Sequence, residues 1–171
     1  GDLAPHTVKG FIQGQSLHRF TPSADILLTG MHHGGKDPFN ELKYVHDVAA
    51  IIKKQDEIDW DWVLMQARRY RMERLIYVAL RMANELFATP VPDTIAARVG
   101  SGMTGRLARN RIRFMENSLE YRHPWITVND WIFRIRTRRG IRLKIQLALY
   151  IAGVAGRRFL LPAKWQNTEV A

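Results

Sequence analysis

The sequence predicts a mainly α fold, a multi-helix bundle preceded by a short N-terminal β-hairpin. Apolar residues recur at helical spacing through most of the chain after residue 20. Hydroxyl, carboxylate, proline and glycine residues separate these runs at the places where helices begin and end. A hydrophobic content of 46% is enough to build a core, and the lack of Cys excludes disulfide scaffolds, thiol nucleophiles and thiolate zinc sites.

Residues 6–20 have the pattern of two short strands on either side of Gly14. Such a hairpin is only marginally stable by itself in water. We therefore expect residues 1–20 to complete a domain that lies upstream of this chain.

Five helices are predicted to follow the hairpin. Thr21-Pro22 supplies a hydroxyl N-cap and a proline at the first helical position, and Gly34-Gly35 supplies a left-handed stop. Pro38 is predicted to open the second helix, Asp59 to cap the third, and Asp93 to lie in the first turn of the fifth. The apolar stripes of the second, third and fourth helices comprise Leu42, Val45, Ala49, Ile52, Trp60, Val63, Leu64, Ala67, Leu75, Ile76, Ala79, Leu80, Ala83 and Phe87.

Gly100-Ser101-Gly102 interrupts the helical pattern and is predicted to separate a helical subdomain at 21–99 from a basic helical subdomain at 100–171. Helices are expected in the second subdomain near 104–120, 125–139 and 141–156. The longest apolar run, Ile145–Gly156, has twelve residues, whereas a membrane-spanning helix needs about 20. Because the N-terminus also has no signal-peptide pattern, we expect a soluble, cytoplasmic protein with no transmembrane segment.

Charge is distributed unevenly along the chain. Residues 1–100 carry 12 Lys and Arg against 12 Asp and Glu, whereas residues 101–171 carry 14 against 4, so the net charge of +10 belongs to the second part. The basic run Trp131–Lys144 interleaves arginine with aromatic residues, as sites for phosphate and single-stranded nucleic acid do. The candidate polyanion-binding residues are Arg134, Arg136, Arg138, Arg139, Arg142 and Lys144. Two other interpretations are a helix on an anionic lipid surface and a helix with a core-facing apolar stripe and solvated arginines.

A second polar group comprises His32, His33, Lys36, Asp37, His46 and Asp47. His46-Asp47 with His33 and Asp61 imitates the ligand pattern of a metal-dependent phosphohydrolase. The other interpretation is a structural cluster in which basic groups lie at a helix C-terminus and Asp47 ties them to the next helix. Nucleotidyl transfer needs a Gly-Gly or Gly-Ser turn and then two carboxylates one residue apart on a strand. The chain has no complete set of this kind, since Asp59-Trp60-Asp61 has the spacing but opens a helix.

Two runs of the chain, His33–Lys36 and Leu42–Ala49, follow the pattern His-Gly-x-Lys … Leu-Lys-aromatic-x-x-Asp-Val-Ala. The pattern continues in order through Asp59–Val63, Ala67–Arg69, Glu73-Arg74 and Ala83–Phe87. In these features the chain resembles the uncharacterised bacterial nucleotidyltransferase family over about residues 6–95. It departs from the family at Asp37, where a second His is common.

The resemblance implies that the catalytic half, with its Gly-Ser turn, paired aspartates, Mg²⁺ and NTP, lies upstream of this chain. The chain itself then has no catalytic residue, metal or cofactor, and the motif positions it carries are His33, Lys36 and Asp47. We expect it to pack against the upstream catalytic domain of the same polypeptide and to shape the acceptor site, where its basic part holds nucleic acid or a phosphorylated acceptor. The alternatives are a stand-alone basic module that binds nucleic acid or another polyanion, and the metal-dependent phosphohydrolase.

Overall fold

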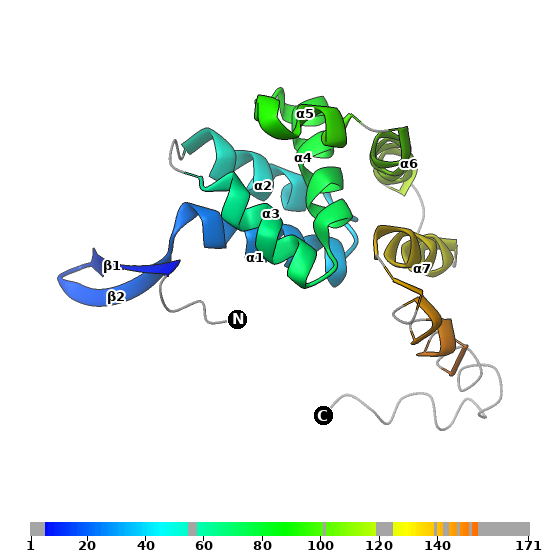
Figure 1. Ribbon diagram of the computed structural model, residues 1–171, viewed down its shortest axis with the longest axis horizontal. Helices are drawn as coiled ribbons and strands as arrows, with labels where there is room; N and C mark the ends of the chain where they lie inside the picture. Colours follow the sequence, from blue (N-terminus) through cyan, green and yellow to red (C-terminus); the bar gives the residue numbers. More distant parts are fainter. Residues whose placement is uncertain are drawn as a thin grey trace.

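The computed structural model of the protein describes residues 6–54, 58–100, 102–118, 125–138, 140–141, 144–146, 148–150 and 152–153. The chain is mainly helical, as predicted, with two antiparallel strands at its N-terminal end. Figure 1 shows helices α1 to α5 gathered in one body, from which the hairpin projects, with α6 and α7 along one side. Among these residues, no helix combines the length and the apolar character that a membrane span requires.

The hairpin pairs β1 (Thr7–Ile12) with β2 (Gln15–Phe20) in the position that the sequence predicts. The two residues between the strands, Gln13 and Gly14, both have positive φ angles, of 50° and 81°. Positive φ at both positions is typical of a type I′ turn, which matches the twist of the strands. The base of the hairpin is attached to the helices by a ring contact between His6 and Trp62, whose centroids are 3.8 Å apart.

The first helix, α1 (Pro22–Gly35), begins where the sequence predicts. The Thr21 hydroxyl accepts a hydrogen bond from the Ala24 amide at 3.4 Å, and Pro22 occupies the first turn. The predicted left-handed stop at Gly34-Gly35 is wrong, because both glycines are helical and neither has a positive φ.

The chain turns between the first two helices at Phe39 instead. Phe39 has a φ of 48°, its side chain is fully buried, and its amide donates a hydrogen bond to the His33 carbonyl at 3.0 Å. Pro38 therefore lies in this turn, and α2 (Leu42–Lys54) begins at Leu42 and not at Pro38 as predicted.

The next three helices lie close to their predicted positions. α3 (Trp60–Arg69) is capped by Asp59, whose Oδ1 accepts a hydrogen bond from the Trp62 amide at 2.9 Å. α4 (Glu73–Phe87) is longer, and α5 (Asp93–Val99) carries its predicted carboxylate in the first turn.

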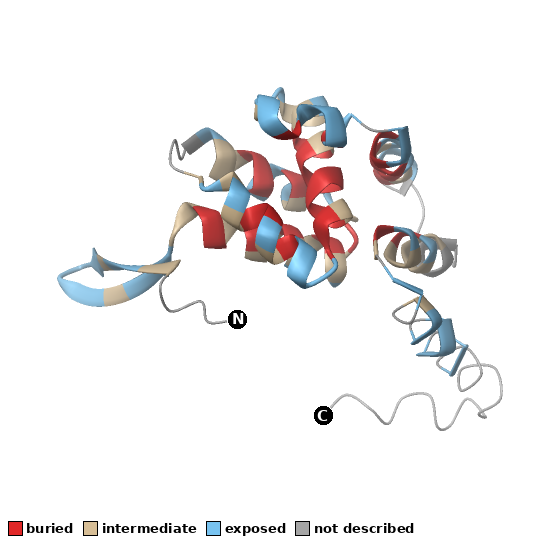
Figure 2. Cartoon of the chain, viewed as in Figure 1, coloured by how far each residue is buried: buried red, intermediate tan, exposed pale blue. Residues whose placement is uncertain are grey.

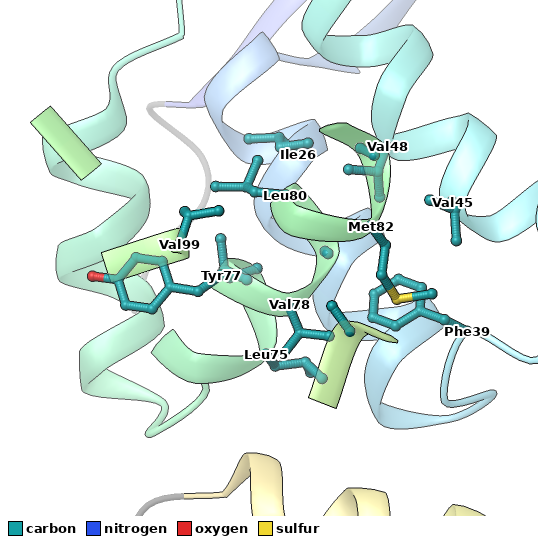
Figure 3. Packing of buried hydrophobic residues seen from close by; sticks show 14 of the residues in the cluster. Ile26, Phe39, Val45, Val48, Leu75, Tyr77, Val78, Leu80, Met82 and Val99 are labelled. Carbon is teal, nitrogen blue, oxygen red and sulfur yellow. The ribbon is translucent and has the colours of Figure 1, made fainter. Parts of the chain in front are cut away.

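The central helix is α4, because buried residues occupy most of its circumference and α1, α2, α3, α5 and α6 (Gly102–Ser118) all pack on it. Figure 2 shows the buried residues concentrated there, and Figure 3 shows part of the resulting core. The core also includes Leu107, Ala108 and Met115 of α6 and Phe133 of α7 (Trp125–Thr137). The predicted division into subdomains at residue 100 stays a prediction. The hydrophobic core contains residues from both sides of this position. The last predicted helix, at 141–156, lies largely outside the described residues.

Arg111 of α6 is a buried cation that joins three parts of the fold. Its side chain is 1% exposed, and its Nη2 donates a hydrogen bond to Asp130 Oδ1 of α7 at 2.6 Å. Asn40, in the turn before α2, donates to the other oxygen of Asp130 at 3.1 Å. The guanidinium also lies over the Phe114 ring, 4.6 Å from its centroid. Burial lowers the pKa of Arg111, and the charge of Asp130 opposes that shift.

Candidate anion-binding site

A buried carboxylate organises the N-terminal end of α4. Glu73 is 2% exposed and lies in the first turn, where a negative charge interacts favourably with the helix dipole. Its Oε1 accepts hydrogen bonds from Arg68 Nε at 2.7 Å and from Tyr77 Oη at 2.8 Å. Arg98 Nη1 lies 3.4 Å from the same oxygen and 3.2 Å from Tyr77 Oη.

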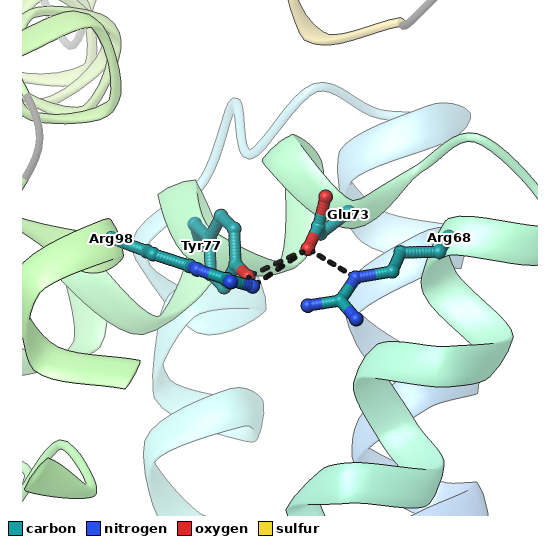
Figure 4. Close-up of polar contacts among 4 residues, drawn as sticks. All are labelled: Arg68, Glu73, Tyr77 and Arg98. Atoms are coloured by element: carbon teal, nitrogen blue, oxygen red, sulfur yellow. Dashed lines mark hydrogen bonds and ion pairs between the residues drawn. The ribbon is translucent and has the colours of Figure 1, made fainter. Parts of the chain in front are cut away.

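These contacts bring three helices to one point. Arg68 comes from the last turn of α3 and Arg98 from the last turn of α5, and both reach the carboxylate on α4 (Figure 4). The hydrogen bond with Glu73 raises the pKa of Arg68.

The four residues line a pocket of about 420 Å³, whose wall is completed by Arg74, Met103 and Thr104. A second pocket, of about 410 Å³, adjoins the first because Arg74 and Met103 line both. The remaining residues around the second pocket are Arg106, Leu107, Asn110, Arg136 and Lys144. We refer to the two together as the arginine pockets.

The arginine pockets carry a large excess of positive charge. The cations that line them are Arg68, Arg74, Arg98, Arg106, Arg136 and Lys144, whereas the one acid among the described lining residues is Glu73. The side chains of Arg68 and Arg98 are 50% and 58% exposed. Since a guanidinium has five N–H donors, both retain donors for a ligand. Such a cluster suits phosphate oxygens, which arginine binds with paired hydrogen bonds.

The basic run that the sequence singles out divides between two places. Arg136 and Lys144 line the arginine pockets. Arg134 and Arg138 lie instead at the C-terminal end of α1. Arg134 Nη2 donates a hydrogen bond to the Lys36 carbonyl. Arg138 Nη2 lies beside Gly35, 3.6 Å from the position that a Cβ of this residue would occupy. A cation at the carbonyl end of a helix is a stabilising, structural arrangement. Arg139 and Arg142 lie outside the described residues.

The motif residues His33, Lys36 and Asp47 lie where α1 and α2 meet. His33 Nε2 is 3.3 Å from Asp47 Oδ2, and the His33 ring stacks on Tyr44 with centroids 4.4 Å apart. Burial lowers the pKa of His33, and the charge of Asp47 opposes that shift. The Lys36 side chain is exposed, and its backbone makes the contact with Arg134.

The structure does not bring His46 and Asp61 to the His33–Asp47 pair. The His46 ring packs against Phe87, with centroids 5.5 Å apart, and Asp61 is exposed in the first turn of α3. His46 and Asp47 therefore lie in different surroundings, the first against Phe87 and the second beside His33.

The acid and two of the cations of the arginine pockets have no distinguishing feature in the sequence. Glu73 belongs to a run of the family pattern, but nothing in that run distinguishes it from a surface acid. Arg98 and Arg106 lie beyond that run, on α5 and α6. Only the packing of these two helices on α4 brings Arg98 to Glu73 and Arg106 to the adjoining pocket.

Residues 2–88 match a family model described as an uncharacterised nucleotidyltransferase. The match covers about half of the chain, from the hairpin through α4. It contains Arg68, Glu73, Arg74 and Tyr77, whereas the pocket residues of α5, α6 and α7 follow it. Neither a curated protein nor a solved structure matches the chain.

Proposed function

The chain belongs to the uncharacterised nucleotidyltransferase family, and from this premise we propose that it is the helical part of a nucleotidyltransferase and binds the phosphate groups of the acceptor. The nucleotidyl group is then transferred from an NTP on a catalytic domain upstream in the same polypeptide. The observation that carries the proposal is the pair of adjoining arginine pockets, which six cations line together with a single buried acid among the described residues.

We infer that the Mg²⁺ that the family implies is held on the other domain, because the acid of the arginine pockets and the N-cap acid of α3 have other partners. Mg²⁺ in such reactions is held by carboxylates that are free to coordinate it. Oε1 of Glu73 instead accepts hydrogen bonds from Arg68 and Tyr77, and Asp59 caps α3. The contribution proposed for this part of the chain is therefore phosphate binding.

The two pockets together suit a ligand with more than one phosphate, such as the end of an RNA. Arg68 and Arg98 lie around the first pocket, Arg106 and Lys144 around the second, and Arg74 lines both. Adjacent phosphates can therefore be bound by separate guanidinium groups. Cations that come from several helices have their positions set by the core, which reduces the entropy lost when a ligand binds.

The hairpin is the proposed contact with the catalytic domain. Phe11 and Ile12 are 73% and 63% exposed at its tip, and the hairpin projects away from the helices (Figure 1). Two strands with exposed apolar side chains are marginally stable unless they pack on a further sheet or helix. Contact with the catalytic sheet would bury both side chains.

The test is the affinity for a 5′-phosphorylated, fluorescein-labelled RNA oligonucleotide, measured by fluorescence anisotropy. Arg106→Glu alters the arginine pockets, and Arg19→Glu, at an exposed residue of β2, is the control with the same change in net charge. We expect Arg106→Glu to weaken binding about tenfold or more, and Arg19→Glu to change it by less than about twofold. Wild-type affinity should also fall steeply as salt is raised, because phosphate contacts release counterions.

Equal affinities of the two variants would contradict the assignment of phosphate binding to the arginine pockets. Binding that does not respond to salt would contradict it as well. Mg²⁺-dependent turnover of NTP by the purified 171 residues would refute the location of catalysis on another domain.

A further inference from the structure

Three side chains at the end of α1 have the composition of a metal site. His32, His33 and Asp37 each offer one nitrogen or oxygen atom, and these atoms lie within 4.8 Å of one another. Within the described part of the chain, this is the group of His, Asp and Glu side chains close enough to share an ion. None of the three lines the arginine pockets, so the group is a separate feature.

His33 is held in the orientation that a metal ligand requires. Asp47 lies 3.3 Å from Nε2, and Tyr44 stacks on the ring. The other nitrogen, Nδ1, is buried and has no hydrogen-bond partner among the described residues. A buried polar atom in this state costs about 1–3 kcal/mol, and a bound ion would satisfy it. Ligating histidines commonly donate their second N–H to a carboxylate, which orients the ring.

The spacing of the rings fits a tetrahedral ion. With Zn–N bonds of about 2.0–2.1 Å at the tetrahedral angle, two ligating imidazole rings have centroids about 5.2 Å apart. The centroids of His32 and His33 are 5.3 Å apart, with an angle of 72° between the rings. Ligand atoms of such a site are about 3.3 Å apart. His32 is exposed and Asp37 is partly exposed, so both side chains can close the remaining distance.

The donor set selects a transition metal over Mg²⁺. Two imidazoles and one carboxylate suit Zn²⁺, whereas Mg²⁺ prefers oxygen ligands. Asp37 and Asp47 contribute two negative charges, against the exposed Lys36 beside them, and Lys43 of α2 is paired with Glu41 at 2.7 Å. Three protein ligands leave the fourth position of the ion to water.

We propose that His32, His33 and Asp37 bind one Zn²⁺ ion, and that Asp47 orients His33 for this role. The site does not depend on the proposed function, because it uses none of the pocket residues. It is also distinct in chemistry from the Mg²⁺ of nucleotidyl transfer.

The test is equilibrium dialysis of the metal-stripped chain against Zn²⁺, with bound metal measured by mass spectrometry and affinity measured by calorimetry. We expect about one Zn²⁺ per chain for the wild type. His32→Ala and Asp37→Asn should lose this binding, and Asp47→Asn should weaken it about 10–100-fold. The matched controls are His18→Ala and Asp61→Asn, which alter exposed residues outside the group and should bind as the wild type does.

His32 and Asp37 are surface positions, so circular dichroism should show that both variants fold. A wild type that binds no Zn²⁺ would overturn the proposal. Stoichiometric binding that survives in both His32→Ala and Asp37→Asn would overturn it too, because the ion would then lie elsewhere. Equal loss in the two controls would show that binding is spread over the surface and would have the same consequence.

Discussion

Gly34 is the position at which the packing of α1 on α4 can be tested most directly. A Cβ built at this residue would lie 2.6 and 2.7 Å from Leu75 Cδ1 and Cγ, and 2.8 Å from Phe39 Cε2. Leu75 and Phe39 are 1% and 0% exposed, so neither side chain has space to move away. We therefore predict that Gly34→Ala destabilises the protein, even though alanine is the better helix former.

The magnitude follows from these distances. Apolar carbon atoms meet at about 3.5–4.0 Å, so the substitution forces α1 and α4 apart by roughly 1 Å. Overpacking costs about 1–3 kcal/mol, and three simultaneous contacts below 3.0 Å place this substitution in the upper part of that range, at about 2–3 kcal/mol. The change from glycine to alanine within a helix returns about 1 kcal/mol. The expected net loss is about 1–2 kcal/mol, or roughly 2–8 °C in Tm for a chain of this size.

Gly35 provides the matched control, since it is the next residue of the same helix. A Cβ there would lie 3.6 Å from Arg138 Nη2 and 3.7 Å from Met72 Cε, which are ordinary contacts. Gly35→Ala should therefore raise Tm, whereas Gly34→Ala should lower it, in urea and thermal denaturation followed by far-ultraviolet circular dichroism. A Gly34→Ala variant as stable as the wild type would refute the close approach of the two helices. A loss in both variants would instead favour a left-handed helix stop.

Two further substitutions test other parts of the fold by the same denaturation measurement. Asp130→Ala should lower the free energy of unfolding by about 3 kcal/mol, because it leaves the buried Arg111 guanidinium without its counter-ion. A loss below about 1 kcal/mol would mean that the pair is solvated. Asp59→Ala should lower the free energy of unfolding by about 1 kcal/mol, because the hydrogen bond from the Trp62 amide is lost. Asp61→Ala, which removes a neighbouring acid that is not the N-cap, should lower it by less. The reverse order would disprove the cap.

Local features of the fold were predictable because they depend on residues close together in the sequence. The hydroxyl and carboxylate caps at Thr21 and Asp59 act on amides three residues away. The hairpin turn depends on the positive φ of Gly14, a conformation that glycine adopts readily. For the same reason, the apolar stripe of α4 was visible as a spacing. What the stripe packs against was not visible, since periodicity shows that a face is buried and not which helix covers it.

The error at Gly34-Gly35 illustrates that limit. A glycine pair after an apolar run indicates a helix stop on local grounds. The structure uses Gly34 for close contact with Leu75, a residue that is distant in sequence. The positive φ that reverses the chain falls on Phe39, where burial of a large ring holds an unfavourable backbone conformation in place.

The sequence by itself determined that this protein is helical, that a hairpin precedes the helices, and that its charge is concentrated in the second part of the chain. Tertiary structure alone decided which charges act together. It brought Arg68 and Arg98 from two helices to Glu73 and placed Arg106 in the adjoining pocket. It also directed Arg134 and Arg138 to the end of α1. A charged side chain acts over a few ångströms in space, and that distance is set by how α5, α6 and α7 pack against the core, which no local pattern of residues encodes.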